Sequence, residues 1–295
     1  MAEQAQEWWR EAIPRFGMRS LFHALCDLGR DDPPEPILDY ASGQPWLADQ
    51  AERFSQLSVL DRTRPYEPGD EQLRASLSLL YAASRVRDVL LMAHQPAPAD
   101  PGELRDLDEV LDRTPPSFAA VPVARVAEFF AQIGCRAVTV ARFDPAVHEI
   151  VVCEAAPASD APITITGQLW PALMIGELVF ARAGVTVRAG AAHARPGVAD
   201  RSTLYWEYWR RHRPTIDDSF GWGTNSQWQT AFRRDYRTTR GSVFNLDARP
   251  APPPGPPELT GAEAAEFVKN RCPLRAEPGD QFTPLDQMID ERSGS

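Results

Sequence analysis

The chain has 295 residues, of which 43% are apolar and 9% aromatic, enough to bury a hydrophobic core over most of its length. Its formal net charge of -10 opposes a general affinity for nucleic acid or for an anionic membrane surface. No apolar stretch approaches the ~20 residues of a membrane span, and the first residues, MAEQAQEWWR, do not resemble a signal peptide. We therefore expect a soluble, cytoplasmic protein that does not insert into a membrane.

Arginine supplies almost all of the positive charge, because Lys269 is the only lysine among 31 basic residues. Together with 28 prolines, this bias indicates a GC-rich genome and favours a bacterial origin. An arginine in this chain is therefore weaker evidence of bidentate recognition than it is elsewhere.

Residues 1–114 are predicted to be a helical region interrupted by proline-rich breaks. The longest helix is expected after Asp70, a capping residue, and its leucines from Leu73 to Leu91 form a broad apolar face. The other helices are expected over Trp8–Leu28 with a break or kink at Pro14, over Leu47–Leu60, and from Asp100 to about Arg113.

Residues 115–247 are predicted to form a mostly antiparallel sheet with helices packed against it, which makes the fold class α+β. Helical spacing runs over Val123–Ile133. Strand patterns at Arg136–Phe143 and Glu149–Glu154, joined by Asp144-Pro145, predict a β-hairpin. Further strands are expected at Ile163–Thr166, Leu178–Phe180 and Val185–Arg188, with a turn at Gly184.

Residues 248–295 begin with the stretch ARPAPPPGPPEL, whose prolines favour an extended polyproline backbone without a core. We predict a linker here, followed by a polar tail that is mobile unless it docks on the body.

The segment 201–240 differs in charge from the rest of the chain. It carries eight arginines against four acidic residues, whereas residues 1–119 carry twelve basic and twenty-one acidic residues. Its tryptophans and arginines are the residue types enriched at the energetic centres of interfaces. This pattern favours a surface that recognises an acidic protein, a phosphate or single-stranded nucleic acid, and a protein partner is the favoured choice. The two oppositely charged regions could instead dock on each other.

Within this segment, Thr224 and Gln227 have capping-box spacing and predict a helix from about Ser226 to Arg237. On that helix Asp235 would point into the apolar face, where a carboxylate needs a cationic or hydrogen-bonding partner. One interpretation pairs it with an arginine among residues 210–213 as a structural link between two helices. The other places Asp235 and Asn225 in a ligand pocket.

Common catalytic and cofactor motifs are absent from the sequence, so we predict no metal, no cofactor and no assigned catalytic residue. His148-Glu149 could serve acid-base chemistry, but a histidine in a solvated turn is the simpler interpretation. Cys26, Cys135, Cys153 and Cys272 are widely spaced and are expected to be reduced thiols.

The favoured hypothesis is a protein-binding adaptor, regulator or immunity-type factor; the oligomeric state is left open. The second hypothesis is a cofactor-independent hydrolase or transferase that acts on an anionic substrate, using Asp235 or Asp217 with His148 or His212. The predicted binding residues are Trp206, Trp209, Trp222, Asn225, Trp228, Arg233, Arg234 and Asp235.

Overall fold

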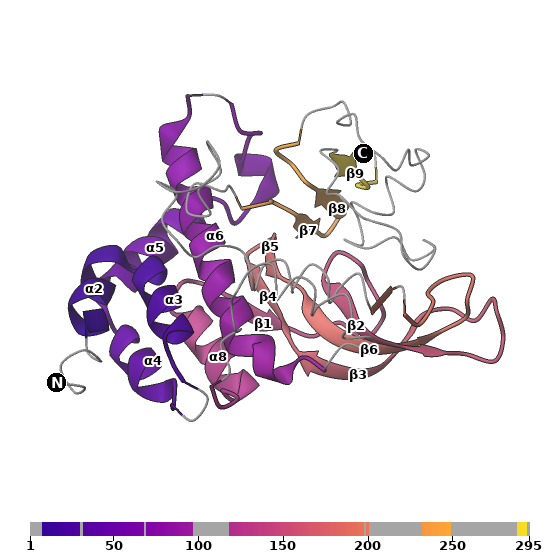
Figure 1. Ribbon diagram of the computed structural model, residues 1–295. Coiled ribbons are helices and arrows are strands. Elements are labelled where there is room, and N and C mark those ends of the chain that lie inside the picture. The colour runs from indigo at the N-terminus through magenta and orange to yellow at the C-terminus, as the bar shows by residue number, and fades with distance from the viewer. Residues whose placement is uncertain are drawn as a thin grey trace, which may run out of the picture.

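Helices make up the first part of the described chain and strands the second, which confirms the α+β class (Figure 1). The computed structural model describes residues 8–29, 32–67, 69–96, 118–197, 199–200, 232–248 and 288–293. The helix predicted at 100–113, the tryptophan-rich residues 201–231 and the proline-rich residues 249–287 lie outside this part of the chain.

Four short helices open the described chain: α2 (Trp8–Phe16), α3 (Met18–Cys26), α4 (Glu35–Ala41) and α5 (Pro45–Ser55). The predicted break at Pro14 is wrong, because Pro14 lies inside α2 and the chain breaks at Gly17, whose φ is 61°. Proline cannot donate a hydrogen bond to the carbonyl four residues earlier. The Tyr40 hydroxyl donates to that carbonyl, on Arg10, at 2.6 Å, so a residue of α4 replaces the missing donor.

The long helix α6 (Glu71–Leu91) runs through the middle of the molecule (Figure 1). It begins where the sequence predicts, since the Asp70 side chain accepts a hydrogen bond from the Leu73 backbone N–H at 3.1 Å. A 3-10 helix, η1 (Leu60–Arg62), precedes α6, and a second one, η2 (Met92–His94), follows it.

The described strands form two sheets. The six-stranded sheet has the order β1-β4-β5-β7-β8-β9 with antiparallel neighbours, and the three-stranded sheet has the order β2-β6-β3. In the smaller sheet β2 and β6 are parallel, whereas β3 and β6 are antiparallel. The strands are β1 (Arg136–Val138), β2 (His148–Ala155), β3 (Thr164–Trp170), β4 (Ala172–Ile175), β5 (Leu178–Ala181), β6 (Ala183–Ala189), β7 (Tyr236–Thr238), β8 (Gly241–Phe244) and β9 (Ile289–Asp290).

The predicted helix at 123–133 is confirmed as α8 (Val123–Ala131), but the hairpin predicted after it is wrong. Strand β1 pairs with β4 in the larger sheet, while β2 pairs with β6 in the smaller one. The turn predicted at Gly184 is also wrong, because Gly184 lies within β6. There a Cβ atom would come within 2.3 Å of the Trp170 ring, so the glycine makes room for the indole.

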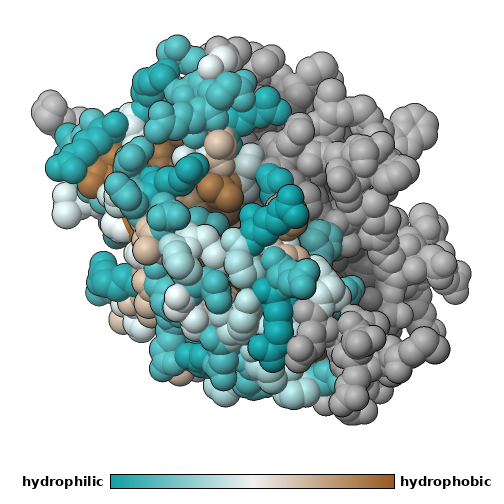
Figure 2. Space-filling model, turned by 90° about the vertical axis from the view of Figure 1, so that its left-hand side faces the viewer, coloured by the Kyte–Doolittle hydropathy of each residue, from teal (hydrophilic) through white to brown (hydrophobic). Residues whose placement is uncertain are grey.

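One hydrophobic core cluster joins the helices to the larger sheet, since it contains buried residues from Trp9 of α2 to Leu246 beyond β8. Figure 2 views the side on which α2, α4 and α5 lie in Figure 1, and the described residues on this face are largely hydrophilic, with hydrophobic atoms visible near the middle and at the left. None of the helices in the described ranges combines the length and the apolar character that crossing a bilayer requires.

Candidate functional site

The structure describes three of the eight predicted binding residues. Arg233, Arg234 and Asp235 lie in the segment that leads into β7, so the predicted helix is wrong over 232–237. The other five lie outside the described residues, as do Asp217 and His212 of the enzyme hypothesis; they are Trp206, Trp209, Trp222, Asn225 and Trp228.

Asp235 is buried, with 1% of its surface exposed, and it is paired with cations, whereas the arginines predicted as its partners, at 210–213, lie outside the described residues. Its Oδ2 accepts a hydrogen bond from Arg182 Nη2 at 3.0 Å, and its Oδ1 accepts from Arg233 Nε at 2.9 Å. The backbone N–H of Asn245 also donates to Oδ1, at 2.8 Å. The described contacts therefore tie β7 to Arg182, between β5 and β6, and to the residue that follows β8.

The buried network continues from Arg182 to helix α6. The Arg182 carbonyl accepts a hydrogen bond from Arg87 Nη2 at 3.0 Å, and the Arg87 guanidinium forms ion pairs with Asp88 and Glu149 at 3.2 and 3.5 Å. Because buried charges need partners with good geometry, these contacts fix α6 against both sheets. We interpret the network as a structural junction.

His148 and Glu149, the candidate acid-base pair, are both buried on β2. The His148 Nδ1 atom accepts a hydrogen bond from the Asp144 backbone N–H at 2.9 Å. Burial lowers the pKa of His148, and the nearby Asp144 carboxylate only partly opposes this effect. The imidazole is therefore neutral near pH 7, and Glu149 is engaged by Arg87.

Arg234 is also buried, and its guanidinium forms a two-pronged ion pair with Asp247. The Nε and Nη2 atoms donate to the two carboxylate oxygens at 2.8 and 2.5 Å, and Nη2 also donates to the Arg64 carbonyl at 2.6 Å. Burial lowers the pKa of Arg234, but the hydrogen bonds and charge of Asp247 outweigh it, so the net pKa is raised. Arg234 is therefore permanently protonated, and its buried guanidinium group lies beneath the surface between α5 and α6.

A pocket of about 240 Å³ opens at that place. It is formed by the end of α5, by η1 and the residues that follow it, and by the first turns of α6. Its lining residues are Arg53, Gln56, Leu57, Arg62, Thr63, Arg64, Asp70, Gln72, Leu73, Ser76 and Arg234. Four of them are arginines and one is an acid, so the lining is strongly basic although residues 1–119 as a whole are acidic.

The four arginines differ in their counterions. Arg234 is paired with Asp247, and Arg64 is paired with Asp70 at 2.5 Å and with Glu67 at 3.4 Å. Arg53 and Arg62 are exposed, and neither forms an ion pair with a carboxylate in the part of the chain that the structure describes. These two guanidinium groups are therefore the cations of the pocket that a bound anion can neutralise.

This pocket was not predicted from the sequence, because the N-terminal region is acidic as a whole. The local signal is the Arg62-Thr63-Arg64 run, which lies only six residues before the Asp70 cap. Arginines that lie close together favour anion binding, whereas the start of α6 is already capped by Asp70. Arg53 comes from a different helix, and only the fold brings it to the same pocket.

Among the described residues, no group of three or more histidine, cysteine, aspartate or glutamate side chains is placed to hold a metal ion. No family model, curated protein or solved structure matches this chain.

Proposed function

We propose that this protein binds a small phosphate-bearing ligand in the arginine-lined pocket between α5, η1 and α6. The observation that carries the proposal is the pair Arg53 and Arg62, which line the pocket without a described counterion. Arginine suits a phosphate because its planar guanidinium group donates two parallel hydrogen bonds to neighbouring oxygens.

The size of the pocket supports a small ligand. Its volume of about 240 Å³ is below the roughly 300–1,000 Å³ of pockets that hold drug-sized molecules. A phosphate group with a short organic substituent suits this space better than a whole nucleotide. The Asp70 carboxylate in the lining opposes an anion only weakly, since Arg64 and the Leu73 N–H already engage it.

This proposal differs from the favoured sequence hypothesis both in the ligand, which is a small anion instead of a protein, and in the place of the site. Arg234 and Asp235 are engaged in the interior, and the Arg233 side chain is 27% exposed and hydrogen-bonded to Asp235. Recognition of a protein partner by the tryptophan- and arginine-rich segment 201–240 remains a hypothesis. Catalysis has less support, because His148, Glu149 and Asp235 are each held by separate structural contacts.

Calorimetric titration of the full-length protein with inorganic phosphate tests the proposal. Arg62→Ala should weaken binding about tenfold or more, because a hydrogen bond to a charged group contributes about 1.5–3 kcal/mol. Arg142→Ala, which removes an exposed arginine outside the pocket lining, should leave the affinity unchanged. Equal affinity in wild type and Arg62→Ala would contradict the proposal.

A further inference from the structure

The last described residues, 288–293, are docked along the edge of β8. Strand β9 pairs antiparallel with β8, and the pairing places Phe244 opposite Ile289 and Val243 opposite Asp290. Beyond β9, the Glu291 N–H donates to the Ser242 carbonyl at 2.9 Å, and the Ser293 N–H donates to the Arg240 carbonyl at 3.0 Å. A segment distant in sequence is thus held by the β8 strand mainly through its backbone.

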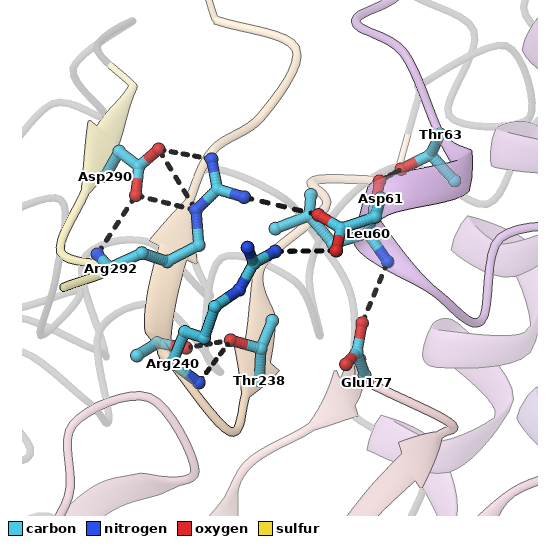
Figure 3. A network of polar contacts seen from close by, with 9 residues as sticks. Leu60, Asp61, Thr63, Glu177, Thr238, Arg240, Asp290 and Arg292 are labelled. Carbon is cyan, nitrogen blue, oxygen red and sulfur yellow. Dashed lines mark hydrogen bonds and ion pairs between the residues drawn. The ribbon is translucent and has the colours of Figure 1, made fainter. Parts of the chain in front are cut away.

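Side chains add specificity to this backbone pairing (Figure 3). The Arg292 guanidinium hydrogen-bonds to Asp290 within the segment, at 2.6 Å for its Nη2, and approaches the Asp61 carboxylate of η1 at 3.4 Å. Arg240, in the turn between β7 and β8, pairs with the other Asp61 oxygen at 2.6 Å. Asp61 therefore bridges η1, the β7–β8 turn and the docked segment.

Gly241 makes the close approach of the segment possible. Its φ is 133°, and a Cβ atom at this position would lie 2.5 Å from the Glu291 carbonyl oxygen. Any side chain at position 241 would collide with the docked segment, so this position requires glycine. The edge of β8, Gly241 and Asp61 together form a site shaped for an extended backbone with an arginine at a fixed position.

We propose that this edge is a peptide-binding site that receives an extended strand of a partner protein. The partner strand carries a hydrophobic residue, then an aspartate, and an arginine two positions later. The chain's own segment Ile289–Arg292 has this pattern and occupies the site in the structure. Strand addition of this kind derives its affinity from main-chain hydrogen bonds and its selectivity from side chains at fixed positions.

The exposure of the docked segment makes displacement feasible, because each of residues 288–293 is exposed or half-buried. The strand pairing covers two residues, and the Asp61 carboxylate to which Arg292 is joined is itself 61% exposed. A tethered segment acts at an effective concentration on the order of millimolar, so a partner strand must bind more tightly or make additional contacts to replace it. The segment therefore sets a threshold that selects strongly binding partners.

The test uses a fluorescein-labelled peptide with the sequence of residues 286–295, DQMIDERSGS, and full-length protein. In the acceptor protein, Glu291→Pro removes the N–H that donates to Ser242 and so weakens docking of the protein's own segment. Arg292→Ala is a second acceptor that leaves the backbone unchanged. We expect fluorescence anisotropy to show the peptide binding to both acceptors, and at least about tenfold more weakly to wild type.

Adding Asp61→Arg to either acceptor should weaken peptide binding at least about tenfold, because Arg292 of the peptide then meets a like charge. Asp49→Arg makes the same charge reversal at an exposed residue of α5 and should have no effect. Equal binding to the Asp61→Arg protein, or no binding to either acceptor at millimolar peptide, would overturn the proposal. A wild-type dimer that Arg292→Ala dissociates in sedimentation would also overturn it, because the site would then be an exchange interface between two copies.

Discussion

Removal of the Asp235 carboxylate should destabilise the protein by about 3–5 kcal/mol, the usual cost of breaking one side of a buried ion pair. In Asp235→Ala, Arg182, which is 2% exposed, loses the carboxylate that its Nη2 contacts at 3.0 Å. The variant also removes the acceptor of the Arg233 and Asn245 hydrogen bonds. Because folded domains are stable by only about 5–15 kcal/mol, the loss should be large in urea unfolding followed by far-UV circular dichroism.

Two further variants separate this effect from a general sensitivity of the segment. Arg233→Ala, whose side chain is partly exposed, should cost no more than about 1 kcal/mol. In Arg182→Met/Asp235→Leu the buried pair is replaced by apolar side chains, which should recover part of the stability lost in Asp235→Ala. A loss below about 1 kcal/mol for Asp235→Ala would refute the interpretation of the network as a structural junction.

Two other predictions concern the sheets. Gly184→Ala should lower the free energy of unfolding by about 1–3 kcal/mol, because its methyl group would overlap the Trp170 ring. Gly167→Ala in β3 places its methyl group at ordinary contact distances and should cost less. Thermal unfolding of the two variants makes the comparison. His148 should make stability fall as the pH drops from 7.5 to 5. The pKa of His148 in the folded protein lies below the usual value of about 6.5, so the unfolded chain binds the proton more readily. The free energies of unfolding of wild type and His148→Gln should therefore converge at low pH.

The features that the sequence predicts correctly are those determined by nearby residues. Asp70 begins α6 because a capping interaction involves only residues three positions apart. The helix at Val123–Ala131 follows from its apolar spacing in the same way. The pairing of the strands between residues 136 and 154 could not be predicted from nearby residues alone. Alternation identifies a strand, but the choice of β4 and β6 as partners depends on contacts formed by the whole fold.

The error at residues 232–237 has a specific cause. Phe232 and Tyr236 are four residues apart, and this spacing places two residues on one face of a helix and also on one face of a strand. The pattern therefore predicts that both are buried, which is correct, without deciding between the two structures. The burial of Asp235 beside a cation was predicted from a helical wheel, although the segment is not a helix. Arg233, one of its described partners, is two positions away, whereas Arg182 is 53 positions away and could not be identified.

The candidate pocket depends on residues that no single segment of the sequence brings together. Arg62 and Arg64 are close in sequence, whereas Arg53 lies on α5 and Arg234 precedes β7. The sequence shows how many arginines there are, but the counterion of each is set by the fold. Asp247 neutralises Arg234. Arg53 and Arg62 have no counterion among the described residues, so they can bind an anionic ligand.

A crystal structure of the protein soaked in selenate would test the proposed anion pocket most directly, because anomalous scattering locates the ion without reference to any expected position. We predict an anion between Arg53 and Arg62, within hydrogen-bond distance of both guanidinium groups. Selenate bound only elsewhere on the molecule, with the pocket empty in the same crystal, would contradict the proposed function.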